Sequence, residues 1–522
     1  AELNYRQAIE INPQHLGGYI NLHRLFDLSG KTNQAIDFAK KISQSYPDEL
    51  FWGLKQYLVL PILYQNEEEI NFYRHRFTEG LKTIINSLNL TTETLRKNAL
   101  DTIKEHNNFF LAYQGKNDLN LQSQYGDLLE RIIKANNWCN LGEIKKKKIQ
   151  KKKIRVGYIS SYLRNHTVGK LYLGWIKNHN RDHFEIYCYH LLGQTPLKDE
   201  LTVKYQEYSD QFFTIEASDL ENECQKIINS DLDILVFLDI GMESAIYPIA
   251  ASRLAPIQCL TWGHPVTSGI PTIDYFLSSE LMEPQNAQEH YREKLIFLPN
   301  ISICYPQPSL PEQILDRSFF QLKKDSIIYL SCQSLFKYLP QYDYIFPRIA
   351  QQIKDAQFLF LSFYDSKGER ITDLFKHRLQ ESFRKFDLNS EEYCLFLPRL
   401  NTQQYLSLNL ISDVYLDTFS WSGGNTTLEA IACNLPVVTC PGELMRGRHS
   451  YGILKMLGVT ETIASCEEEY IEIAVRLGSD LSYREEIREK IQANHHRLYD
   501  DLECIKALEK FYQDVIKIQN VT

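Results

Sequence analysis

The chain has 522 residues, 43% hydrophobic and 12% aromatic, which is enough apolar material for several packed domains and excludes a disordered polypeptide. A net charge of -9 argues against a protein that binds nucleic acid mainly through phosphate contacts. Its 11 scattered cysteines include no C-x-x-C pair, and no apolar run approaches the ~20 residues that cross a bilayer, so we expect a cytoplasmic protein with neither nucleic acid nor membrane as a partner.

Residues 1–50 carry a helical repeat. Pro13 and Pro47 lie one tetratricopeptide period apart, and this template places apolar residues at its packing positions: Tyr5 and Ala8 in one repeat, then Tyr19, Leu22, Phe26, Ala35 and Ala39 in the next. An ordinary helical hairpin is the alternative. Because residue 1 is Ala and a repeat stack needs about three units to bury its core, we expect a piece of a longer protein with further repeats before it.

Residues 51–152 keep a helical pattern with few strand signals and predict a helical connector. Its end is a lysine run over 145–148 and 151–153. Since no aromatic residue is interleaved with these lysines, we interpret the run as a solvated linker rather than a binding patch.

From residue 153 the pattern changes to short apolar runs that alternate with longer amphipathic ones. The runs are 155–160, 184–189, 212–215, 234–238 and 257–262, and after a restart near residue 326 they are 327–331, 358–363, 395–397, 414–416 and 437–439. This alternation predicts two α/β domains with parallel sheets, 153–310 and 311–522, joined by a proline-rich linker over 299–311. Ligands bind beyond the carboxyl ends of such strands, so the cleft between the domains is the predicted active site.

The segment 420–430, SWSGGNTTLEA, follows a predicted strand and opens a predicted helix. A glycine-rich loop at a helix N-terminus attracts anions, although neither the dinucleotide fingerprint nor the P-loop motif is present. Thr426 and Glu429 also match the capping box, which many helices use for structural reasons alone. On local grounds, a phosphate cradle and a plain helix cap are equally good interpretations.

Three further loops follow predicted strands. Residues 261–271 hold His264, Thr267 and Ser268 and suit a polar ligand, residues 164–169 hold His166, and residues 331–337 end at Lys337. Alone, a loop histidine is more often structural and a lysine more often a surface charge. The Asp231-Leu232-Asp233 triplet precedes its strand, so we expect no metal site there.

Five segments in chain order carry a resemblance to a known family: RVGYISSYLRNHTVG, RLAPIQCLTWGHPVTSGIPTIDY, EHYREKLIFLP, CQSLFK and LDTFSWSGGNTTLEAIACNLPVVTCPGELMRGRHS. The chain resembles the protein O-GlcNAc transferase and SPINDLY family of glycosyltransferases. The resemblance implies a GT-B fold, in which two Rossmann-like α/β domains face a cleft, behind an α-helical tetratricopeptide-type region. It also implies transfer of a sugar from a nucleotide donor to Ser or Thr of proteins.

The resemblance assigns donor-side roles in the second α/β domain. Lys337 matches the lysine that neutralises the departing diphosphate, and Thr426 and Thr427 match a hydroxyl pair that contacts the same group, next to Gly424. Glu429 is placed to hold the ribose. Residues 261–271 add His264, Thr267 and Ser268 to the predicted donor-binding set.

On the acceptor side, His166 matches a histidine considered as a general base, and Lys170 replaces its partner in some members. At the nucleobase, Leu400 falls where a backbone group reads the base. Tyr405 and Asn425 stand where O-GlcNAc transferases have histidine, and these departures weaken the prediction of uridine. Arg448 keeps a family arginine.

The resemblance therefore predicts an inverting protein O-glycosyltransferase, with UDP-GlcNAc as the first choice of donor and no metal requirement. His166 and Lys337 are the predicted catalytic residues, and the helical repeats are expected to hold part of a protein acceptor. The alternatives are a GDP-fucose donor, as in SPINDLY, a UDP-glucose donor, and an inactive repeat scaffold. A transferase for small molecules is disfavoured by the repeats.

Overall fold

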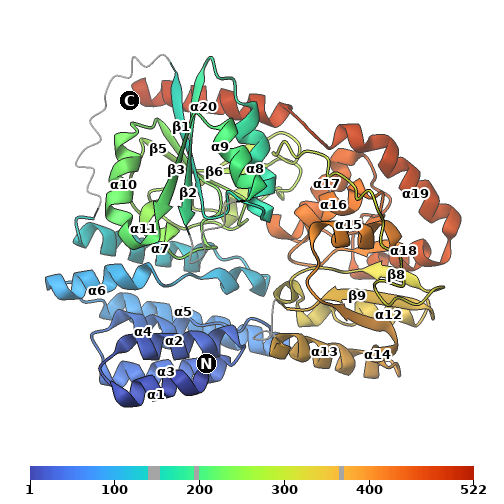
Figure 1. The fold of residues 1–522 in the computed structure, drawn as a ribbon, viewed down its shortest axis with the longest axis horizontal. Helices are drawn as coiled ribbons and strands as arrows, with labels where there is room; N and C mark the ends of the chain where they lie inside the picture. The colour runs from blue at the N-terminus through green and yellow to red at the C-terminus, as the bar shows by residue number, and fades with distance from the viewer. Residues whose placement is uncertain (139–152, 193–198, 364–368, 522) are drawn as a thin grey trace.

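The computed structural model describes residues 1–138, 153–192, 199–363 and 369–521. Most of the predicted lysine linker, residues 145–152, lies outside the described residues. Figure 1 shows three parts: a helical region at the N-terminus and two α/β domains beside it.

The N-terminal helices are α1 (Glu2–Ile11), α2 (Leu16–Leu28), α3 (Thr32–Ser45) and α4 (Leu50–Leu58). Of the predicted packing positions, Leu22, Phe26, Ala35 and Ala39 are buried and Tyr5 and Tyr19 are partly buried, whereas Ala8 is exposed. Small alanines on α3 let α2 and α4 approach it closely. The predicted helical pairing in this region is confirmed.

The connector continues as α5 (Glu67–Ser87), α6 (Glu93–Ile103), the 3-10 turn η1 (Phe109–Gln114) and α7 (Leu119–Ala135). Asn66 and Thr92 start α5 and α6, because their side chains accept hydrogen bonds from free backbone N–H groups of the first turn. Gly126 of α7 lies directly on the backbone of Gly269, where a Cβ would come within 2.0 Å of the carbonyl oxygen. The connector therefore packs tightly on the first α/β domain.

The first α/β domain contains a parallel sheet with the strand order β3-β2-β1-β4-β5-β6-β7. Its strands are β1 (Ile154–Ser160), β2 (Phe184–Leu192), β3 (Gln211–Glu216), β4 (Ile234–Phe237), β5 (Ile257–Thr261), β6 (Tyr275–Ser279) and β7 (Lys294–Leu298), with helices α8 (Thr167–Asn178), α9 (Glu200–Tyr208), α10 (Leu220–Asn229) and α11 (Ile246–Ala250). The first five strands were predicted, whereas β6 and β7 were not. The order reverses between β1 and β4, which is where such sheets bind ligands.

The second α/β domain has the parallel order β10-β9-β8-β11-β12. Its strands are β8 (Ile327–Leu330), β9 (Ala356–Leu361), β10 (Cys394–Leu397), β11 (Val414–Leu416) and β12 (Val437–Val438). Its helices are α12 (Ile345–Ala350), α13 (Glu369–Arg384), α14 (Ser390–Tyr393), α15 (Thr402–Ile411), α16 (Asn425–Ala432), α17 (His449–Leu457), α18 (Glu467–Ser479) and α19 (Leu481–Asn494). All five predicted strands are present.

The last helix, α20 (Glu503–Val521), crosses back to the first α/β domain (Figure 1). The hydroxyls of Tyr512 and Tyr158 lie 3.1 Å apart, and Glu509 Oε1 lies 3.2 Å from His179 Nδ1. The predicted division at residue 311 places α20 with the second half of the sequence, while in space it covers the first sheet. Residues 299–326, between β7 and β8, contain no helix or strand, as a linker would.

The helical region also contacts the second α/β domain. Arg446 Nη2 lies 3.0 Å from Asp118 Oδ2, and Arg74 Nη1 lies 2.8 Å from the other oxygen of the same carboxylate. Arg378 of α13 donates to the backbone oxygen of Tyr64 at 2.6 Å. Along the described ranges, no helix is both long and apolar enough to span a bilayer.

Candidate active site between the two domains

The glycine-rich loop between β11 and α16 is held by Asp417. This buried carboxylate accepts from Ser422 Oγ at 2.6 Å, Gly423 N at 2.7 Å and Thr439 Oγ1 at 2.7 Å. Burial raises the pKa of Asp417, and these donors oppose the increase. The loop therefore has a fixed shape before any ligand arrives.

Helix α16 has no side-chain cap, so the predicted capping box is wrong. The helix begins at Asn425, after Gly424, and Thr426 lies inside its first turn. Thr426 Oγ1 instead accepts from Gln333 Nε2 at 2.8 Å and from the Tyr415 hydroxyl at 2.9 Å. The Thr426 hydroxyl therefore bonds to Gln333 and Tyr415 and does not cap the helix. The first N–H groups of α16 are left without a side-chain acceptor and can bind an anion.

The two loop glycines differ. A Cβ on Gly423 would lie 2.6 Å from Thr426 Oγ1 and 2.7 Å from Gln333 Nε2, so the loop backbone presses directly on these groups. A Cβ on Gly424 would meet no heavy atom closer than His449 Nδ1, at 3.8 Å. A side chain at Gly424 would therefore meet its neighbours only at ordinary van der Waals distance, without the overlap that Gly423 would give.

Lys337 lies beside this helix start, at the end of a 3-10 turn after β8. Its Nζ donates to Gln333 Oε1 at 2.8 Å and lies 5.9 Å from the centre of the Trp421 ring. Burial lowers the pKa of Lys337 to about 8, while the Asp417 carboxylate opposes the decrease. Lys337 is thus a partly buried cation, not a freely solvated surface charge.

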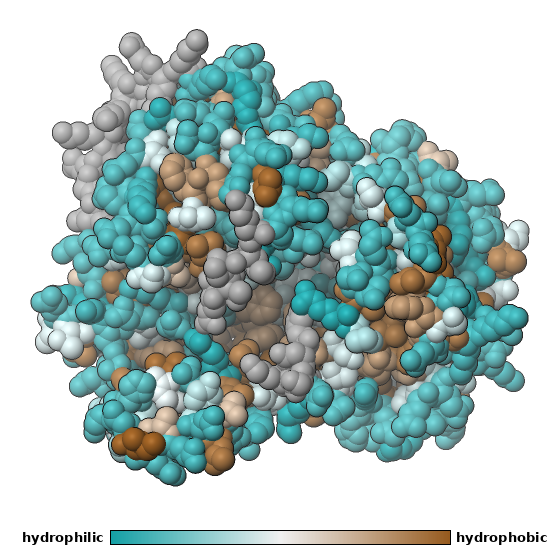
Figure 2. All heavy atoms as spheres, viewed as in Figure 1, coloured by the Kyte–Doolittle hydropathy of each residue, from teal (hydrophilic) through white to brown (hydrophobic). Residues whose placement is uncertain are grey.

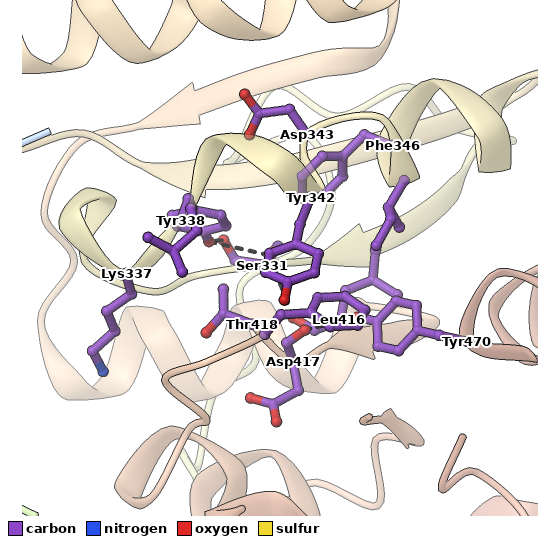
Figure 3. A pocket seen from close by; sticks show the side chains of 13 residues that line it. Ser331, Lys337, Tyr338, Tyr342, Asp343, Phe346, Leu416, Asp417, Thr418 and Tyr470 are labelled. Carbon is purple, nitrogen blue, oxygen red and sulfur yellow. Dashed lines mark hydrogen bonds between the residues drawn. The ribbon is translucent and has the colours of Figure 1, made fainter. Parts of the chain in front are cut away.

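A cavity of about 20 Å³ lies behind Lys337 and Asp417. Figure 3 shows Tyr338, Tyr342, Phe346 and other side chains around it. Its volume suits one water molecule rather than a nucleotide. This small cavity is therefore not large enough to be a nucleotide site.

His166 is the N-cap residue of α8, the helix that contacts α16 of the second α/β domain. Its Nδ1 accepts from Val168 N at 3.3 Å, and its ring stacks on Tyr162 at a centroid distance of 4.1 Å. Burial, together with the charges of Arg164 and Lys170, lowers the pKa of His166 to about 4. The ring is therefore neutral near pH 7 with its proton on Nε2, so it offers an N–H group to a ligand.

Lys170 joins the two α/β domains across the cleft. It lies one helical turn after His166, and its Nζ is 2.9 Å from Glu429 Oε1 of α16. The Glu429 side chain is buried, whereas that of Lys170 is partly exposed. The carboxylate predicted to hold the ribose therefore has a protein partner in this structure.

His264, Thr267 and Ser268 lie where the connector meets the first α/β domain. His264 is buried against Phe109, with ring centroids 5.5 Å apart, and burial lowers its pKa to about 3. Thr267 Oγ1 donates to Glu293 at 2.6 Å, and Ser268 N donates to the same carboxylate at 2.8 Å. Of the three, His264 is nearest to the donor side, because its ring lies 5.6 Å from that of Trp421.

The predicted nucleobase residues sit on or beside α15 and α16. Leu400 precedes α15 and is partly exposed, while Tyr405 is buried within α15. Burial raises the pKa of Tyr405. Asn425 Oδ1 accepts from the Tyr305 hydroxyl at 2.5 Å.

A second, much larger cavity of about 880 Å³ opens beside the cleft. It is lined by α2, α4 and the turn after α6 on one side, and by the carboxyl end of β2 and residues after β1, β3 and β4 on the other. Figure 2 shows the surface hollowed where the helical region meets the α/β domains. Tyr162 and Arg164, which flank the His166 loop, are part of its wall.

The profile of glycosyl transferase family 41 matches residues 76–304 and 308–506, which is most of the chain. The chain belongs to glycosyl transferase family 41. Curated members similar to it include the probable UDP-N-acetylglucosamine–peptide N-acetylglucosaminyltransferase SEC of Arabidopsis thaliana, 26% identical over 69% of this chain and 37% of that protein. The SPINDLY protein of Solanum lycopersicum is 24% identical over 70% of this chain and 39% of that protein. The chain thus spans about two fifths of the length of these relatives.

A solved structure supports the same fold. A mutant of the Thermobaculum terrenum O-GlcNAc transferase superposes with a TM-score of 0.73 at 21% identity, covering 99% of this chain and 94% of that one. The predicted GT-B fold behind a tetratricopeptide-type region is confirmed.

Sequence reasoning overlooked several residues that shape the site of this family 41 chain. Gln333, Tyr415 and Asp417 link the loop, the helix and the lysine, although no role was predicted for them. Gln333 did give a signal, since it precedes Lys337 by four positions in the CQSLFK segment.

Across the described part of the chain, no group of three or more His, Cys, Asp or Glu side chains could hold a metal ion. The Asp231-Leu232-Asp233 triplet lies at the amino end of β4. Asp233 Oδ2 there accepts from Arg155 N at 2.8 Å, so it fixes the start of β1.

Proposed function

We propose that this member of the family is an inverting glycosyltransferase that moves a sugar from a nucleotide donor to Ser or Thr of a protein. One arrangement carries the proposal. Lys337, Thr426 and the N-terminus of α16 come together at the carboxyl ends of β8 and β11, and α16 contacts α8 of the other domain, whose N-cap residue is His166. This is a binding site for a diphosphate with its leaving bond turned toward the acceptor domain.

In the proposed reaction, the acceptor hydroxyl attacks the anomeric carbon while the bond from that carbon to the diphosphate oxygen breaks. The charge that develops on the diphosphate is received by Lys337, by the Thr426 hydroxyl and by the N–H groups of α16. The proton of the acceptor hydroxyl leaves on the acceptor side of the cleft.

His166 is the proposed acceptor-side group, and its tautomer favours orienting a ligand through Nε2–H. To act as the general base it would have to release the Val168 contact first. The pH dependence of transfer by His166→Ala separates the two roles. Loss of an acidic limb near pH 4 supports the base, and an unchanged limb supports an orienting role.

UDP-GlcNAc is the first donor to test, because the names of the SEC and SPINDLY relatives include this sugar nucleotide. We propose that Leu400 and Tyr405 flank the nucleobase and that Glu429 meets the ribose after exchanging its contact with Lys170. A tyrosine and an asparagine at positions where O-GlcNAc transferases have histidine keep GDP-fucose as a second candidate.

We propose that the large cavity admits a segment of the acceptor protein. It runs from the α2 and α4 helices to the strand-order reversal beside His166, and its volume exceeds that of a single sugar. A protein acceptor contacts both the helical region and the first α/β domain in this arrangement.

A donor screen tests the proposal. UDP-GlcNAc, GDP-fucose and UDP-glucose are each added to the purified chain, and the melting temperature and sugar transfer to a mixture of cell proteins are measured. A true donor raises the melting temperature by mass action and labels protein. If no nucleotide sugar does either, the proposed function is wrong.

A further inference from the structure

Gln333 is a buried amide that contacts Lys337 and Thr426, the two side chains that we propose bind the diphosphate. Its Oε1 accepts from Lys337 Nζ at 2.8 Å, and its Nε2 donates to Thr426 Oγ1 at 2.8 Å. Nε2 also donates to the Tyr415 hydroxyl at 2.7 Å. One side chain thus connects the lysine after β8 with the helix after β11.

The chemistry of these groups fixes the direction of each hydrogen bond. A lysine ammonium donates only, so the amide oxygen of Gln333 faces Lys337 and the amide NH₂ faces the two hydroxyls. Tyr415, which accepts from Gln333, donates its own proton to Thr426 at 2.9 Å. Thr426 Oγ1 therefore accepts two hydrogen bonds, which use both of its lone pairs.

The Thr426 hydroxyl can therefore only donate a hydrogen bond to a ligand. Lys337 likewise keeps two N–H groups, and the first N–H groups of α16 have no partner within the helix. Every one of these groups is a donor, whereas the oxygens of a diphosphate are acceptors. We propose that Gln333 is a positioning residue that sets this all-donor polarity and thereby selects a nucleoside diphosphate, an inference that rests on the proposed function.

Packing holds the amide in place. Gln333 is 2% exposed, and the backbone of Gly423 lies against it so closely that a Cβ there would be 2.7 Å from Nε2. A flipped amide would point its NH₂ at the Lys337 ammonium, which cannot accept a hydrogen bond, so the polarity of the cradle exists before binding.

The test compares ligands with and without phosphate. UDP and GDP are measured by calorimetry, and uridine and guanosine by competition, with the wild type, Gln333→Leu and Gln333→Glu. For the diphosphate that the wild type binds, Gln333→Leu is expected to weaken affinity roughly 10-fold while nucleoside affinity stays within about twofold. Gln333→Glu is expected to lose more, because it adds a negative charge and cannot donate to Thr426.

The control is Gln357→Leu. Gln357 is also a buried glutamine of the second domain, but its Oε1 accepts from Lys323 N and Ser326 Oγ at the amino end of β9, away from the cradle. This variant is expected to bind diphosphate and nucleoside as the wild type does.

Tyr415→Phe tests whether the hydrogen bonds to Thr426 matter for diphosphate binding, and it leaves Gln333 unchanged. It frees one lone pair of Thr426, so diphosphate affinity is expected to fall about threefold with nucleoside affinity unchanged. If the Gln333 variants do not fold, the result for Tyr415→Phe decides whether the inference stands. Equal losses for diphosphate and nucleoside, or no loss, would overturn the inference, whereas a wild type that binds neither UDP nor GDP would instead overturn the proposed function.

Discussion

Lys170 Nζ lies 2.9 Å from Glu429 Oε1, and this one ion pair joins α8 of the first α/β domain to α16 of the second. Lys170 lies one turn after His166 on α8. Glu429 belongs to α16, the helix whose N-terminus is proposed to bind the diphosphate. The pair therefore couples the position of the acceptor side to that of the donor side.

A double-mutant cycle is expected to reveal this coupling. Lys170→Ala, Glu429→Ala and the double variant are unfolded with urea, and the free energies of unfolding should be non-additive by about 1 kcal/mol or more, because Glu429 is buried. The exposed pair of Lys82 and Glu79 on α5 is the control, with an expected coupling of about 0.5 kcal/mol or less. Additive effects of the Lys170 and Glu429 substitutions would contradict a linking role.

Lys337→Met is expected to reduce kcat for sugar transfer roughly 100-fold or more, since the departing diphosphate loses its nearest cation. Methionine keeps most of the side-chain volume, so the fold should persist. Lys324→Met, an exposed lysine of the same domain, is the matched control and should transfer sugar normally. Steady-state assays at saturating donor measure both, and equal rates for the two variants would remove Lys337 from the reaction.

The decrease of kcat/KM at alkaline pH is expected to follow the deprotonation of Lys337. Its pKa lies at about 8 instead of 10.5, and the protonated form is the one that balances the diphosphate. The value of kcat/KM for the donor should therefore be constant below that pKa and fall as pH rises through it. In the donor complex the diphosphate raises the pKa, so the limb in kcat lies at higher pH. Lys337→Arg stays protonated and should lose the limb, and a limb unchanged in this variant would assign it to another group.

The two neighbouring threonines of α16 are expected to differ. Thr426 is half-buried with its proton free, so Thr426→Val should weaken UDP or GDP binding roughly 10-fold. Thr427 is fully buried with its hydroxyl 2.7 Å from Ser450 Oγ, so Thr427→Val should instead cost about 1 kcal/mol of stability with a smaller change in affinity. Calorimetry and urea unfolding measure the two effects, and the opposite pattern would show that Thr427 is the diphosphate contact.

Much of the fold was predictable because apolar runs mark buried parallel strands. Ten strands matched, from β1 to β5 and from β8 to β12. The two that escaped prediction, β6 and β7, are short and flanked by glycine, proline and charged residues, and they form one side of the first sheet, where β7 is the edge. The pattern of β7 is weak because an edge strand is only partly buried, whereas β6 is almost wholly buried but its YFLSS run ends in two serines.

The site was less predictable, because its contacts join residues that are far apart in the sequence. The match of Thr426 and Glu429 to a capping box is a local pattern, yet Gln333 and Lys170 supply the actual partners from 93 and 259 positions away. The role of Asp417 likewise depends on Thr439 of the next strand. Only the resemblance to a family, and not the spacing of residues, pointed to Lys337.

The carboxylate of Asp118 contacts Arg74 of the connector and Arg446 of the second α/β domain at the same time, and Arg378 reaches the backbone at Tyr64. The helical region therefore contacts both α/β domains and helps to fix their relative position. We therefore expect that replacing these helices would also change the position of the two α/β domains relative to each other. If the proposed function holds, we expect acceptor choice and transfer rate to change together in such a variant.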